Sequence, residues 1–177
     1  MKKLDRGFIQ IYTGNGKGKS TAALGQAVRA AGAGLSSYII QFMKDYPYSE
    51  SDSLKLLSQW ITVEKVGTDD YVFRKEPPPE YEIKKAKIAL EEAKEKMLSG
   101  NYSLVILDEI LVAIYFGLFT AEDVLPFFEL KPENVELILT GRYCPQVFID
   151  RADLVTEMNE IKHYYQKGIL SRPGIDS

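Results

Sequence analysis

Apolar runs alternate with amphipathic stretches along most of this chain. Two runs near the N-terminus, residues 7–13 and 37–42, are rich in β-branched and aromatic residues and predict buried strands. Residues 19–31 between them are mostly good helix formers with apolar side chains at helical spacing, and two glycines follow within three residues. The order strand, loop, helix, strand predicts a βαβ unit with parallel strands and a right-handed crossover.

The alternation continues in the second half of the chain. Apolar residues at intervals of three and four predict a long helix that begins after three prolines and ends at Gly100. A predicted capping box, Thr120 with Asp123, starts a later helix. Further strands are expected at 104–107, 135–140 and 154–158. Further helices are expected directly after residue 109 and from Pro145 to near Ala152. This alternation predicts an α/β fold, with a mostly parallel sheet and helices on both faces.

The least regular part of the chain is the segment 44–79. It contains a predicted strand, 60–66, and three consecutive prolines, 77–79. We interpret this segment as a βα insertion over one face of the sheet and not as a second domain. A length of 177 residues suits one compact domain, so we expect residues 1–177 to form a single one.

Composition and charge exclude several classes of protein. The chain is 45% hydrophobic and 27% charged, which excludes a largely disordered protein. Its net charge of −3 argues against a nucleic-acid partner, because dedicated nucleic-acid binders normally carry a basic excess. The single cysteine, Cys144, and the single histidine, His163, exclude an internal disulfide and a Cys/His zinc site.

Two observations concern membranes and targeting. The longest apolar run, residues 110–119, is too short to cross a bilayer, which takes about 20 residues. The first residues are charged and lack the apolar stretch of a signal peptide. We therefore expect a cytoplasmic protein without a membrane partner.

A glycine-dense loop, residues 13–21, lies between the first predicted strand and the first predicted helix. It matches the end of the phosphate-loop pattern G-x-x-x-x-G-K-[S/T] at 18–20, while Thr13 replaces the first glycine. Its glycines let successive N–H groups point at phosphate oxygens, and the helix N-terminus adds positive charge. Lys19 would bridge terminal phosphate oxygens and Ser20 would ligate Mg²⁺, with Lys17 as a second cation. The alternative is a glycine-rich turn with exposed lysines.

Asp108 and Glu109 directly follow the apolar strand predicted at 104–107. In a phosphate-loop fold, carboxylates at such a strand end approach the magnesium ion of the loop, directly or through water. We therefore predict that Ser20, Asp108 and Glu109 form the metal site. The alternative is an acidic helix N-terminus that is favoured by the helix dipole and has no metal.

These motifs belong to a longer likeness. The chain strongly resembles the ATP:corrinoid (cob(I)alamin) adenosyltransferases of the P-loop type. The likeness covers 8–25, 29–32, 40–42 with Glu50, 105–109, 139–142, 152–158 and 161–163, and ends at Gly168 and 174–176. It implies a P-loop NTPase-like (RecA-like) fold in which the insertion 44–79 faces the corrinoid.

The resemblance also implies an activity. Members of this family transfer the 5′-deoxyadenosyl group of ATP to the cobalt of a reduced corrinoid and leave triphosphate. ATP is then a co-substrate, Mg²⁺ a cofactor and the corrinoid a substrate. A reductase that supplies Co(I) and a second copy of the chain, in a homodimer, are the implied partners.

Individual residues take roles from the same resemblance. Lys19 and Glu109 would be catalytic, at the triphosphate and on the metal side respectively. Arg29 and His163 fall where the family has matching residues near nucleotide or corrinoid, and Arg142 follows a strand end where anions gather. For these three, an exposed surface position is the alternative. The expected ATP-binding residues are Gly14, Asn15, Gly16, Lys17, Gly18, Lys19, Ser20, Thr21, Arg29, Arg142 and His163.

The chain departs from the family before the long helix. The family often has a phenylalanine–tryptophan cluster there, and residues 67–74 contain no tryptophan. Tyr71 and Phe73 are our candidates to replace it as apolar walls of the corrinoid site, with ordinary core packing as the alternative. A conventional P-loop ATPase or small-molecule kinase is the second interpretation of the whole chain, and a nucleotide-sensing module without turnover is the third.

Overall fold

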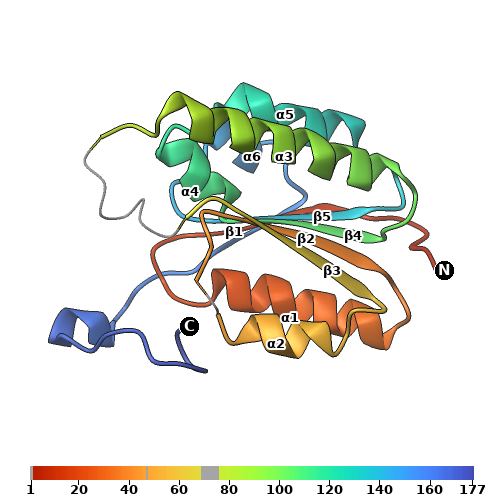
Figure 1. Cartoon of the computed structure of the whole chain (residues 1–177). Coiled ribbons are helices and arrows are strands. Elements are labelled where there is room, and N and C mark those ends of the chain that lie inside the picture. The colour runs from red at the N-terminus through yellow and green to blue at the C-terminus, as the bar shows by residue number, and fades with distance from the viewer. Residues whose placement is uncertain (1, 47, 69–75) are drawn as a thin grey trace.

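The computed structural model describes residues 2–46, 48–68 and 76–177, and the strands of this part form one parallel sheet (Figure 1). Across the sheet the strand order is β3-β2-β4-β5-β1-β6. Every pair of neighbouring strands is parallel. The strands are β1 (Ile9–Thr13), β2 (Ser37–Phe42), β3 (Ile61–Val66), β4 (Leu104–Asp108), β5 (Glu136–Thr140) and β6 (Leu154–Glu157).

Helices cover both faces of this sheet, as the alternating pattern predicted (Figure 1). One face carries α1 (Lys19–Gly32) and α2 (Glu50–Lys55). The other carries α3 (Glu80–Leu98), α4 (Ile110–Tyr115), α5 (Ala121–Leu130) and α6 (Gln146–Ile149). A C-terminal tail follows β6 and contains a 3₁₀ turn, Tyr164–Lys167.

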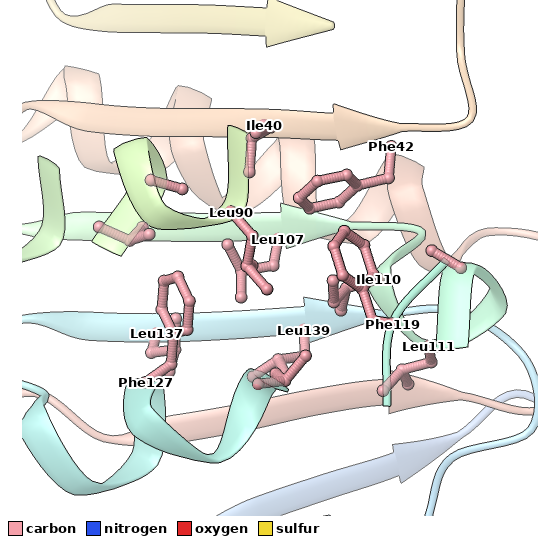
Figure 2. Packing of buried hydrophobic residues seen from close by; sticks show 14 of the residues in the cluster. Ile40, Phe42, Leu90, Leu107, Ile110, Leu111, Phe119, Phe127, Leu137 and Leu139 are labelled. Atoms are coloured by element: carbon pink, nitrogen blue, oxygen red, sulfur yellow. The ribbon is translucent and has the colours of Figure 1, made fainter. Parts of the chain in front are cut away.

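The buried side chains form one apolar layer on each side of the sheet. Along β2, Tyr38 and Ile40 belong to the layer under α3, α4 and α5, while Ile39 belongs to the layer under α1. This alternation follows from the period of two in a strand. Within the first layer Phe42 meets Phe119 edge to face, with ring centroids 5.2 Å apart (Figure 2). The central strands are therefore buried on both faces, which explains their continuous apolar sequence.

The segment 44–79 contributes to the main sheet. Its predicted strand is β3, which pairs with β2 in parallel at the edge of the sheet. It also contains α2, a helix that the sequence analysis did not predict. Our assignment of this segment to the corrinoid stays a prediction, and Tyr71 and Phe73 lie outside the described residues.

Because the strands are parallel, all their carboxyl ends lie at one edge of the sheet. In open α/β sheets this edge is where ligands bind. The loop between β1 and α1 lies here, together with the ends of β2, β4 and β5 and the C-terminal tail (Figure 1). No helix in the described part of the chain has the length and apolarity required to cross a bilayer.

Candidate active site

The glycine-rich loop is packed against the residue that follows β6. Gly16 N donates to Met158 O at 2.6 Å, and Met158 N donates to Thr13 O at 2.8 Å. A Cβ atom added to Gly14 or Gly16 would lie 2.5 Å or 2.7 Å from Met158 O. These glycines thus allow a close approach of two backbones, which is a separate requirement from the phosphate binding predicted for the loop.

Lys19 lies at the base of this loop, in the first turn of α1. The side chain is 7% exposed, and its Nζ donates to Gly16 O at 2.7 Å. Burial lowers its pKa; the carboxylates of Glu109 and Asp108 oppose this shift, and the charge of Arg142 adds to it. Gly18, with φ 115°, is the N-cap residue, so the loop turns into the helix at a conformation that favours glycine.

Lys17 points to the C-terminal tail. Its Nζ forms an ion pair with Asp176 and donates to Tyr164 Oη at 2.9 Å and Ile175 O at 2.6 Å. Arg172 forms a second ion pair with the same carboxylate, with 2.9 Å between its Nε and Asp176 Oδ2. A cavity of about 530 Å³ lies beside these contacts, lined by Gly16, Lys17 and residues 159–164, which include His163. The loop and the tail therefore share one surface.

Asp108, at the end of β4, is fully buried and bonded on both oxygens. Oδ1 accepts from Thr140 Oγ1 at 2.7 Å, and Oδ2 accepts from Gln41 Nε2 at 3.0 Å and from Lys44 Nζ at 2.8 Å. Burial alone would raise its pKa, but the charge of Lys44 and these hydrogen bonds outweigh that effect and keep the pKa below its usual range. Asp108 is thus a buried anion with protein partners.

Glu109 has a different environment from its neighbour. It adopts a left-handed backbone with φ 61° as the N-cap residue of α4, and its N–H donates to Thr140 Oγ1 at 2.9 Å. Burial raises the pKa of its carboxyl, and the negative charge of Asp108 adds to the shift. Within the described residues its carboxylate makes no hydrogen bond or ion pair that competes with a cation.

The remaining predicted residues differ in their distance from the loop. Arg142 is exposed, and its positive charge lowers the pKa of both Lys19 and Glu109. Arg29 is exposed in the last turn of α1, ten residues after Lys19, which is about 15 Å along the helix axis. Asn15, within the loop, and Thr21, in the first turn of α1, are exposed. The structure thus brings Arg142 to the loop and leaves Arg29 at the other end of α1.

His163 is half-buried in the tail. Its Nδ1 accepts from Tyr165 N at 3.1 Å, where it caps the 3₁₀ turn. Its ring lies against that of Tyr164, with centroids 4.8 Å apart. Through the shared cavity, His163 is near Gly16 and Lys17 of the loop.

Sequence reasoning missed several residues of this site. Lys44 follows the end of β2 by two positions, and Gln41 is on the same strand. Thr140 ends β5. The available signal was their place at strand ends, because parallel strands deliver such residues to one edge. The contact of Asp176 and Tyr164 with the loop had no signal in local spacing, because only the fold brings the tail to the loop.

Comparisons with known proteins agree with this geometry. A family model described as ATP:corrinoid adenosyltransferase BtuR/CobO/CobP matches residues 5–177. The corrinoid adenosyltransferase of Escherichia coli (strain K12) is 32% identical over 174 residues, covering 97% of this chain and 86% of that protein. The corrinoid adenosyltransferase of a Sinorhizobium species is 33% identical over 178 residues, covering 97% of this chain and 81% of that protein.

A solved structure provides the comparison of folds. The KaiC-like protein of Pyrococcus horikoshii OT3 superposes with a TM-score of 0.59 at 17% identity, covering 90% of this chain and 76% of that one. This likeness confirms the predicted P-loop NTPase-like (RecA-like) fold. Because the family model spans the loop, the acidic strand end and the tail, the chain belongs to the ATP:corrinoid adenosyltransferase family.

Proposed function

We propose that this chain transfers the 5′-deoxyadenosyl group of ATP to the Co(I) ion of a reduced corrinoid and releases triphosphate. The observation that carries the proposal is the family match over residues 5–177. The electron pair of Co(I) attacks C5′ of the ribose and forms the cobalt–carbon bond, so that Co(I) becomes Co(III). The bond between C5′ and its oxygen breaks, and its electron pair leaves with the triphosphate.

The loop residues bind and stabilise the leaving group. The N–H groups of 14–20, except that of Gly16, which donates to Met158 O, surround the triphosphate together with the ammonium of Lys19. The negative charge of the triphosphate grows as the carbon–oxygen bond breaks. Donors that are already in place lower the barrier of such a step, because they need no reorganisation during the reaction. The hydrogen bond from Lys19 Nζ to Gly16 O, at 2.7 Å, supports this role because it already fixes the ammonium against the loop.

The side chains present suit a magnesium ion that arrives with the nucleotide. Magnesium in nucleotide sites takes one or two protein oxygens and completes its shell with phosphates and water. The hydroxyl of Ser20 and the carboxylate of Glu109 are hard oxygen donors of this kind, and we propose them as ligands. Bound there, the ion supplies further positive charge to the departing triphosphate.

The reaction needs no protein base, because the nucleophile is a reduced metal with its own electron pair. The chain offers no obvious histidine base. Its single histidine is His163, whose Nδ1 already accepts from the backbone of Tyr165. A conventional ATPase would instead need a base to activate water, and the carboxylate of Glu109, whose charge acts on Lys19, is a candidate, so the reaction products must distinguish the two interpretations.

We also propose that the chain acts as a homodimer and receives its Co(I) substrate from a reductase. Family resemblance is the basis of both statements. The exposure of apolar side chains on the edge strand β6 supports the first, since Leu154 is 43% and Val155 is 38% exposed. Light scattering of the purified chain should give twice the monomer mass; a monomer at micromolar concentration would contradict the homodimer.

One incubation tests the transfer reaction. The chain is mixed anaerobically with ATP, Mg²⁺ and chemically reduced cobalamin, and phosphorus products and the corrinoid spectrum are followed together. We expect triphosphate and alkylated corrinoid in equal amounts, and neither product when cobalamin is omitted. ADP and phosphate that form without cobalamin would replace the proposal by the ATPase or kinase interpretation.

A further inference from the structure

One buried cation of the site has no part in the function proposed above. Lys44 is 7% exposed and follows Met43, which adopts a left-handed backbone with φ 57°. Its Nζ lies 2.8 Å from Asp108 Oδ2 and 3.4 Å from Ser20 Oγ. A side-chain ammonium therefore bridges two residues that the sequence analysis assigned to the metal.

The contact with Ser20 places this ammonium on the phosphate side of the site. Ser20 is the second residue of α1, directly after Lys19, in the turn whose free N–H groups face the loop. A terminal phosphate oxygen bound between Lys19 and Ser20 is therefore within reach of the Lys44 side chain. The ring of Tyr48, 5.1 Å from Nζ, flanks the same ammonium.

Both carboxylate oxygens of Asp108 are already hydrogen-bonded within the protein. Its two oxygens accept from Thr140, Gln41 and Lys44. The carboxylate of Glu109 is not engaged in this way within the described residues, although it directly follows Asp108. The two carboxylates therefore suit two roles: Glu109 can approach a metal, whereas Asp108 fixes a lysine.

We propose that Lys44 is a phosphate-binding residue of the ATP site, and that Asp108 is a positioning residue that holds Lys44 in place and does not ligate the metal. This inference rests on the proposed function, which supplies the triphosphate. An ammonium carries three N–H donors. Lys44 can thus keep its bond to Asp108 while it donates to a phosphate oxygen and leaves the hydroxyl of Ser20 to the magnesium ion.

The first test measures binding of inorganic triphosphate by calorimetry, with EDTA and without corrinoid, so that neither metal nor turnover contributes. Lys44→Met alone would leave Asp108 buried without a counter-ion, so Lys44→Met/Asp108→Asn is compared with Asp108→Asn. We expect the double variant to bind about tenfold more weakly or worse, as fits a lost charge-assisted hydrogen bond. Equal affinity of the two variants overturns the role of Lys44.

Two further variants serve as controls for this test. Lys44→Arg keeps the positive charge and is expected to bind triphosphate like the original chain. Lys65→Met removes a lysine whose Nζ lies 5.6 Å from the same Tyr48 ring but donates to Tyr46 O. It is expected to leave triphosphate affinity unchanged, and a loss equal to that of the double variant would contradict a specific role of Lys44.

The second test separates the carboxylates by the Mg²⁺ concentration that gives half-maximal ATP binding. Glu109→Gln is expected to raise this concentration about tenfold, and Asp108→Asn to leave it within about threefold. An equal rise in both variants overturns the positioning role of Asp108. Failure of the original chain to adenosylate reduced cobalamin would refute the proposed function alone, because these binding tests involve no corrinoid.

Discussion

At the scale of single residues, the pKa values of two adjacent carboxylates, Asp108 and Glu109, are shifted in opposite directions. The pKa of Asp108 lies below its usual range because Lys44 and three hydrogen bonds offset the effect of burial. The pKa of Glu109 lies above its usual range because burial and the charge of Asp108 act in the same direction. Glu109 therefore gains most from the arrival of a cation, which would stabilise its ionised form.

Replacement of Lys19 by alanine tests the central charge of the loop. Loss of its ammonium should remove about 2–4 kcal/mol of transition-state stabilisation, by analogy with lost oxyanion donors. This corresponds to a decrease in kcat/KM of roughly 30- to 1,000-fold. Initial rates of adenosylation measure it, with the exposed Lys85→Ala as control; an unchanged rate in Lys19→Ala would show that the loop does not bind the triphosphate as we describe.

The single cysteine gives a prediction about pH. Burial raises the pKa of the Cys144 thiol to about 11, compared with about 8.5 for a free cysteine. Between these values the unfolded chain releases the thiol proton first, so this group makes folding less favourable as pH rises through that window. At pH 8 we expect iodoacetamide to alkylate the folded chain on the order of a hundredfold more slowly than the chain in urea. Equal rates would show that the thiol is accessible and unshifted.

The loop and the acidic pair can be predicted from sequence alone, because local spacing carries both motifs. It did not distinguish Asp108 from Glu109. That difference comes from Lys44 and Thr140, which lie 64 and 32 residues from Asp108 in the chain. Only the pairing of neighbouring strands makes them its neighbours, so no local pattern could have identified them.

At the scale of elements, α5 is held by a side-chain cap as well as by packing. Thr120 Oγ1 accepts from Asp123 N at 3.3 Å, and Asp123 Oδ2 accepts from Thr120 N at 2.8 Å. This is the capping box predicted from the sequence. Asp123 also forms an ion pair with Lys87 of α3 at 2.9 Å, so the cap of α5 links two helices of the same layer.

Replacement of Thr120 by alanine should lower the free energy of unfolding by about 1 kcal/mol, because the N–H of Asp123 loses its acceptor. Urea unfolding followed by circular dichroism measures this loss. Glu122→Gln, in the same turn but exposed, should change stability by less than about 0.5 kcal/mol. A loss in Thr120→Ala no larger than that of the control would contradict the capping role.

The elements that could be predicted are those with a strong apolar pattern. The central strands were found because they are buried on both faces, which makes their sequence continuously apolar. Helix α2 was missed because, of its six residues, only Leu54 is buried. Helix α6 is shorter than expected: Pro145 is its N-cap residue and it ends at Ile149.

At the scale of the whole molecule, the sheet order collects distant parts of the chain at one edge. The site combines the β1–α1 loop with residues from the ends of β2, β4 and β5. The C-terminal tail then brings Asp176 to Lys17 across 159 positions of sequence. Linear motifs predict the loop and the acidic pair at the end of β4, and the topology brings the residues of β2 and β5 and the tail to them.

Replacement of Asp176 by asparagine tests the contact between tail and loop. Without this carboxylate the ammonium of Lys17 is more available to an incoming anion, so the affinity for inorganic triphosphate should rise about two- to fivefold, as expected for a partly exposed ion pair. Calorimetry at low ionic strength measures the change, because salt screens such pairs. In a Lys17→Met background the gain should vanish. A fall in affinity after Asp176→Asn would mean that the tail itself helps to hold the anion.

The bond from Lys19 to the carbonyl of Gly16 has a consequence for how nucleotide enters. In the free protein this lysine already cross-links its own loop at 2.7 Å. Because an ammonium has three N–H donors, Lys19 can keep this bond while it donates to an incoming phosphate. The nucleotide therefore meets a side chain that is already ordered, and the conformational entropy of Lys19 has been lost in advance, during folding. The same ordered side chain is then in position when the triphosphate departs.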